Sequence, residues 1–148
     1  MQQDLTLIII ANESEAAFYS SAGLGRGLHR LSEISAADFA DTHRAHTKPM
    51  GRGKGGPAGE THEYEPKTSD RRLSRENFSH HVAEAAEEIW EAEPFTRLFV
   101  VAPPRMLGAL RDDLPGSLTR NLAGDLDKDL VKVPLQDLPE HFRGLIVL

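Results

Sequence analysis

The stretch LFVVAPPRMLGAL, residues 98–110, contains the sharpest change of pattern in the sequence. Its first four residues are all apolar, which predicts a strand buried on both faces. Pro103 ends that strand, because proline lacks the N–H that a paired central strand needs. Pro104 suits the first turn of a helix, where the N–H would have no partner anyway. The apolar residues of that helix then share one face: Met106, Leu107 and Leu110.

The segments upstream of this stretch predict three strands. Residues 5–11, LTLIIIA, form a second continuous apolar run, so this strand should be central in its sheet. Residues 16–21 (AAFYSS) follow after a polar turn and predict an antiparallel partner. Residues 28–34 (LHRLSEI) are more polar, which favours an edge position.

The middle of the chain predicts a long loop and then a helix. Residues 40–68 have no apolar period and are rich in glycine and proline. Ser69 or Asp70 can cap the helix that follows, and Pro94 ends it. Its apolar residues recur every three or four positions: Phe78, Val82, Ala85, Ala86 and Ile89.

The last part of the chain predicts one more strand and a short helix. The strand is expected at 121–130, and DLPE at 137–140 has the spacing of a capping box. The whole order is β-β-β-loop-α-β-α-β-α, which is typical of a ribonuclease H-like fold. We therefore predict an α/β fold with a mixed five-stranded sheet. In it the strands at 5–11 and 97–102 are adjacent and parallel.

Length and composition predict one soluble domain over residues 1–148. There is no cysteine, so disulfides and thiolate sites are excluded. The longest apolar run is too short to span a bilayer, and the N-terminus does not have the pattern of a secretory signal. We expect a cytoplasmic protein without membrane insertion.

Charge is distributed unevenly along the chain. The formal net charge is −6, from 17 basic and 23 acidic side chains. Residues 43–59, the cationic segment, contain no acidic residue and four basic ones, so the rest of the chain carries −10. Its glycines allow close approach of an anion to the backbone, and the same composition also suits a flexible, solvated loop that binds nothing. The predicted anion- or RNA-binding residues here are Arg44, Lys48, Arg52, Lys54, Gly55 and Gly56.

Arg105 is a second candidate for anion binding. It lies at the start of a helix, beyond the carboxyl end of a parallel strand, where open α/β sheets usually bind ligands. A nuclease of this fold would instead need carboxylates at the ends of two strands to hold metal ions. The first strand ends in Asn12 and Glu13, and the later strand ends in APP, so that metal cage is not assembled.

Other patterns favour surface residues over metal ligands. Asp125, Asp127 and Asp129 are spaced like the start of a calcium loop, but Leu130 replaces its glycine and Gln136 its glutamate. Histidines at 43 and 46, or at 80 and 81, lack the partners of a zinc site. The polar cluster of Glu60, His62, Glu63 and Glu65 lies in the loop and predicts no catalysis. We expect no cofactor and no metal.

Several blocks of the sequence resemble the bacterial host attachment protein family, whose members are described as required for attachment to host cells. The most specific are RLFVVAPPRMLGALR at 97–111 and DLDKDL at 125–130, together with ENF at 76–78. The resemblance covers essentially the whole chain. The family is akin to the ribonuclease H-like middle domain of archaeo-eukaryotic release factors and of Pelota.

The resemblance has consequences for the cationic segment. In release factors, the matching loop carries a Gly-Gly-Gln tip that promotes peptidyl-tRNA hydrolysis. Here Pro57 follows Gly55 and Gly56. The missing glutamine argues against that hydrolysis, while the resemblance stays compatible with a basic loop that enters an RNA-lined pocket. Asn12 also departs from the family, where an aspartate is common.

Two functions from different classes follow. The first is a non-catalytic ribosome- or RNA-associated module that uses the cationic segment. The second is an enzyme acting on a small anionic substrate near Arg105. The family description adds a host or envelope component as a candidate partner.

Overall fold

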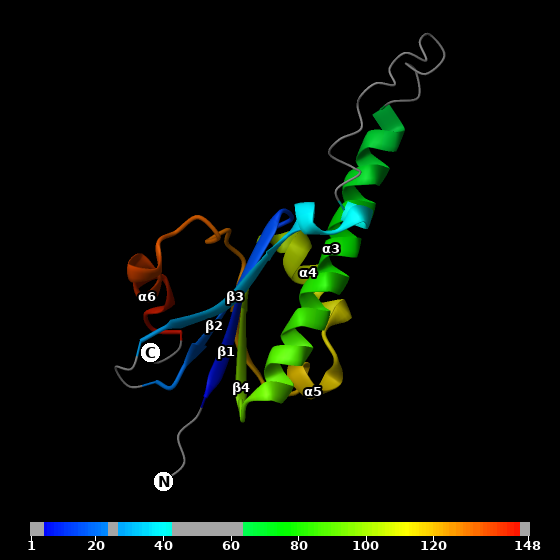
Figure 1. Cartoon of the computed structure of the whole chain (residues 1–148). Coiled ribbons are helices and arrows are strands. Elements are labelled where there is room, and N and C mark those ends of the chain that lie inside the picture. Colours follow the sequence, from blue (N-terminus) through cyan, green and yellow to red (C-terminus); the bar gives the residue numbers. More distant parts are fainter. Residues whose placement is uncertain (1–4, 24–26, 43–63, 146–148) are drawn as a thin grey trace.

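Five strands form one mixed sheet in the computed structural model, which describes residues 5–23, 27–42 and 64–145, with the backbone alone for 64–69. The strands are β1 (Thr6–Ala11), β2 (Glu15–Ser21), β3 (His29–Ser35), β4 (Arg97–Val101) and β5 (Leu122–Leu126). Their order is β3-β2-β1-β4-β5. β1 pairs antiparallel with β2 and parallel with β4 (Figure 1). The predicted α/β fold and the parallel pairing are confirmed.

Helices cover both faces of the sheet. The longer ones are α3 (Tyr64–Ala92) and α4 (Pro104–Asp113), and the short α5 (Gly116–Thr119) follows them. Figure 1 shows these three on one face and α6 (Leu138–Phe142) on the other. The described residues also contain two 3-10 turns, η1 (Ala36–Asp38) and η3 (Leu135–Asp137). No helix in the described ranges is long and apolar enough to cross a membrane.

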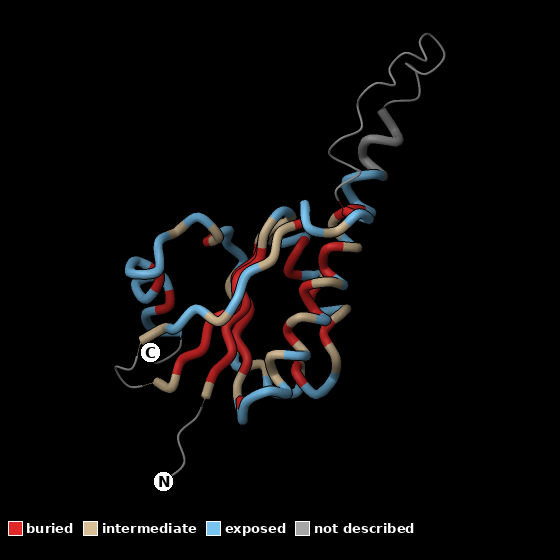
Figure 2. The backbone as a smooth tube through the Cα atoms, in the orientation of Figure 1, coloured by how far each residue is buried: buried red, intermediate tan, exposed pale blue. Residues whose placement is uncertain are grey.

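β1 is the centre of the core, because alternate residues enter two separate apolar clusters. Leu7 and Ile9 pack toward α3 and α4, whereas Ile8 and Ile10 pack toward α6. All four are at most 1% exposed, and burying each stabilises the fold by about 1.5–3 kcal/mol. Figure 2 shows the buried residues concentrated in the central strands and on the inner sides of the helices. This two-sided burial explains the continuous apolar run.

The loop predicted over 40–68 is wrong at both ends. Residues 40–42 are helical, and α3 begins at Tyr64 and not at the predicted cap near Ser69. Pro66 lies in the first turn of α3, where the N–H has no intrahelical partner and proline is tolerated. The apolar stripe was placed correctly at Phe78 and Val82, which are fully buried.

Two predictions in the C-terminal third need correction. The last strand ends at Leu126, so Asp127 and Asp129 follow it. Asp137 forms no capping box, because η3 places it in a helical conformation where its side chain does not reach back. A capping box is found at Ser35 instead, which pairs with Asp38 at η1.

Gly124 and Gly108 should respond oppositely to alanine substitution. A Cβ at Gly124 would lie 2.9 Å from the ring of buried Phe99, so Gly124→Ala should destabilise by about 1–3 kcal/mol. Gly108 is exposed within α4 with open space beside it, so Gly108→Ala should stabilise by about 0.5–1 kcal/mol. Urea unfolding measures both. Equal effects would contradict the packing of β5 on β4.

Candidate nucleic-acid interface

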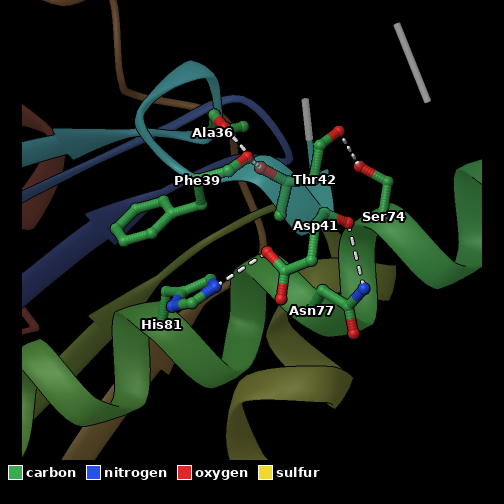
Figure 3. A network of polar contacts seen from close by, with 7 residues as sticks. All are labelled: Ala36, Phe39, Asp41, Thr42, Ser74, Asn77 and His81. Carbon is green, nitrogen blue, oxygen red and sulfur yellow. Dashed lines mark hydrogen bonds and ion pairs between the residues drawn. The ribbon is translucent and has the colours of Figure 1, made fainter. Parts of the chain in front are cut away.

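The cationic segment begins directly after Thr42, whose position is fixed by hydrogen bonds. The Thr42 hydroxyl donates to the carbonyl oxygens of Ala36 and Phe39. The Thr42 carbonyl accepts a bond from the Ser74 hydroxyl of α3 at 3.1 Å. Thr42 is fully buried and Ser74 nearly so. The chain therefore leaves the core at a point held against α3 (Figure 3).

Asp41 adds a second set of contacts between α3 and the residues that precede the cationic segment. Its carbonyl accepts a bond from Asn77 Nδ2 at 3.0 Å, and its carboxylate lies 2.9 Å from His81 Nε2. The His81 ring stacks on Phe39, with ring centroids 3.8 Å apart and planes 11° apart. We call Asp41, Thr42, Ser74, Asn77 and His81 the clamp (Figure 3).

The clamp fixes the point from which the chain leaves the core before the cationic segment. Ser74 lies ten residues after the start of α3, which is about 15 Å along the helix axis. Figure 1 shows these first turns of α3 extending beyond the sheet. The chain between Thr42 and Tyr64 thus joins a fixed point on the core to the outer end of a helix.

The predicted site residues fall into two groups. Arg44, Lys48, Arg52, Lys54, Gly55 and Gly56 lie outside the described residues. Arg105 is described and is exposed in the first turn of α4, just beyond the carboxyl end of β4. Pro103 occupies the N-cap and makes no side-chain cap bond.

The carboxyl ends of the parallel strands carry an amide–carboxylate contact. Asn12 Nδ2 lies 3.1 Å and 3.3 Å from the two carboxylate oxygens of Asp129. Asn12 Oδ1 accepts bonds from the backbone N–H groups of Ser14 and Glu15. Next to it, Arg75 of α3 pairs with Glu13 at 3.3 Å. A neutral amide thus occupies one of the positions where a two-metal nuclease needs a carboxylate.

The other candidate metal ligands are dispersed. Asp125 contacts Arg111, and Asp127 is exposed. His80 pairs with Asp113, whereas His81 belongs to the clamp. Among the described residues there is no group of three or more side chains that could hold a metal ion. The residues at 43, 46, 60, 62 and 63, and the side chain of residue 65, lie outside the described parts.

A cavity of about 390 Å³ lies over β2 and β3, and Arg105 is not one of its lining residues. Its charged lining comprises three carboxylates and one arginine: Glu15, Glu33, Asp38 and Arg30. Arg30 already contacts Glu33 and donates to the Tyr19 hydroxyl, and that bond raises the pKa of Arg30. The cavity is therefore unsuited to an anionic substrate.

Sequence reasoning missed the clamp, although a partial signal was present. Ser74 and His81 lie four residues before and three after Phe78. Both side chains therefore lie on the same side of α3 as its apolar stripe. Polar residues on a buried face predict partners from another element. The identity of those partners depends on tertiary contacts across more than 30 positions.

Residues 7–142 match the model of the family described as "Protein required for attachment to host cells". The chain belongs to this family. No curated protein matches it.

Among solved structures, one match is the crystal structure of the archaeal translation termination factor aRF1. The TM-score is 0.46 with 14% sequence identity. The match covers 94% of this chain and 40% of that chain.

Ser74→Ala should loosen the clamp. The substitution leaves the buried Thr42 carbonyl without its donor, so the free energy of unfolding should fall by about 1–2 kcal/mol. Ser117→Ala, on an exposed position of α5, is the matched control and should change it by less than about 0.5 kcal/mol. Urea unfolding distinguishes them, and equal effects would contradict the clamp.

Asn12→Asp should create a pH-dependent loss of stability. It places a second carboxylate against Asp129, costing about 1 kcal/mol at pH 7, as for like charges about 4 Å apart in water. Repulsion raises the pKa of the pair in the folded variant, so the loss grows as pH rises and disappears below about pH 4.

The double variant N12D/D129N exchanges the amide and the carboxylate and should restore stability at pH 7. Unfolding of both variants at pH 4 and pH 7 measures this. A loss that is independent of pH, or that is not restored by the exchange, would contradict the contact.

Proposed function

We propose that this protein is a non-catalytic, cytoplasmic module that associates with ribosomes or another RNA through its cationic segment. The observation that carries the proposal is the separation of charge. Four permanent positive charges lie within residues 43–59 with no acidic residue among them, on a chain whose net charge is −6. The net negative charge disfavours nucleic acid on average, so binding should concentrate where basic residues cluster, first of all at this segment.

The clamp supports the same proposal. A segment rich in glycine loses much conformational entropy when it binds. Thr42, the residue before it, is buried and hydrogen-bonded to Ser74 of α3, so the point where the segment begins is already fixed before binding.

The alternative, an enzyme acting on a small anion near Arg105, has less support. Arg105 is exposed and does not line the cavity over β2 and β3. That cavity presents mainly carboxylates. A site for a small ligand usually buries most of it in a mainly apolar pocket.

The family description concerns attachment to host cells. In this proposal the protein is required for attachment only indirectly. A module that associates with ribosomes alters production of the proteins that contact the host or the envelope. Direct contact with a host component remains the alternative partner, and it requires no RNA.

Replacing Arg44, Lys48, Arg52 and Lys54 together by serine should abolish most RNA association. The change removes four positive charges and takes the formal net charge from −6 to −10. Co-sedimentation with ribosomes at low salt should fall strongly. The melting temperature should barely change, since the described core contains none of these residues.

The matched control removes four exposed basic residues from other parts of the surface: Arg120, Lys128, Lys132 and Arg143. It has the same net charge, and its co-sedimentation should stay near that of the wild type. Equal losses in both variants would show that net charge alone matters. A wild type that never associates with ribosomes or RNA at low salt would contradict the proposal.

A further inference from the structure

Arg71 and Arg75 lie on one face of α3, close to the start of the cationic segment. They are four residues apart, so their side chains leave the helix about 5–6 Å from each other. Arg71 is exposed and makes no hydrogen bond or ion pair with another described residue. Arg75 is mostly buried, with 14% of its side chain exposed. Nothing in the core requires a positive charge at Arg71.

Among the described residues, Arg75 makes one polar side-chain contact, and that contact is long. Its Nη1 atom lies 3.3 Å from Oε2 of Glu13, on the turn after β1. Charge-assisted hydrogen bonds are usually about 2.7–2.9 Å long, and a guanidinium can offer two parallel donors. The Glu13 side chain is 43% exposed, so it can turn into solvent at little cost. An anion such as phosphate, which can accept two parallel hydrogen bonds, would bind Arg75 more strongly than Glu13 does.

We propose that Arg71 and Arg75 form a phosphate-binding face for an RNA strand, and that Glu13 occupies this face in the free protein. The inference rests on the proposed function, because the same RNA contacts the cationic segment. The separation of the two side chains is comparable to that of neighbouring phosphates along a strand. Consecutive phosphates therefore engage the two arginines, and the second one displaces Glu13.

The remainder of α3 restricts how the strand approaches. Glu84, Glu88 and Glu91 are exposed on its C-terminal half. Arg71 and Glu91 are about 30 Å apart along the axis, several times the screening length of about 8 Å at physiological salt. The acidic half thus leaves the attraction at Arg71 intact, yet it repels RNA laid along the helix. RNA therefore contacts α3 at Arg71 and Arg75, in its N-terminal half.

Two single substitutions test the face, each with a control from the exposed Arg143–Glu140 pair on the surface. The probe is a labelled duplex RNA of mixed sequence, titrated across a range of salt concentrations by fluorescence anisotropy. Arg71→Ser should lower the slope of log Kd against log salt by about one, as for one lost phosphate contact. Arg143→Ser should leave the slope unchanged.

Glu13→Gln should tighten binding several-fold, because it frees Arg75 and removes the competing charge. Glu140→Gln makes the same change in net charge and should leave Kd unchanged. The proposal is overturned if each variant behaves like its control while the wild type binds RNA. It is also overturned if Arg71→Ser weakens binding to phosphatidylserine vesicles and not to RNA.

Two different results would contradict the α3 face and the proposed function. If the serine variant of the cationic segment loses binding but Arg71→Ser does not, only the α3 face is wrong. If the wild type binds neither duplex RNA nor ribosomes at low salt, the proposed function itself is wrong.

Discussion

The double burial of β1 is the constraint on which the rest of the structure depends. Ile8 and Ile10 face one apolar cluster, Leu7 and Ile9 the other, and the backbone is paired on both sides. A strand with no exposed face or edge must be central, so β2 and β4 have to flank it. The parallel pairing with β4 then requires the α3 crossover. That crossover places Arg75 beside Glu13 and Ser74 beneath Thr42.

The polar contacts around the carboxyl end of β1 form one connected region. Asp129 contacts Asn12, and the next residue, Glu13, contacts Arg75. Ser74, adjacent to Arg75, holds Thr42, from which the cationic segment departs. The region therefore contains Glu13, which pairs with Arg75 of α3, and Thr42, after which the cationic segment begins. Because Asn12 is neutral and hydrogen-bonded to Asp129, it favours a structural role over metal binding at the carboxyl end of β1.

Patterns with a clear local cause could be predicted from the sequence. Continuous apolar runs identified β1 and β4, and the double proline identified the boundary between β4 and α4. The start of α3 was missed because Pro66 is typical of loops, although the first helical turn tolerates it. The clamp was missed because Asp41 and His81 are 40 residues apart. Their pairing depends on tertiary packing. The basic character of the cationic segment could be predicted directly, because the number of charged side chains follows from the sequence without knowledge of the fold.

The most direct test of the central claim is ultraviolet cross-linking of the wild-type protein in its native cells, followed by mass spectrometry of peptides joined to RNA. The account predicts adducts on peptides from residues 43–59 and on the first turns of α3 around Arg71. It predicts none on the acidic C-terminal half of α3 or around the cavity over β2 and β3. Adducts concentrated at that cavity, or a protein recovered without any cross-linked RNA, would contradict it.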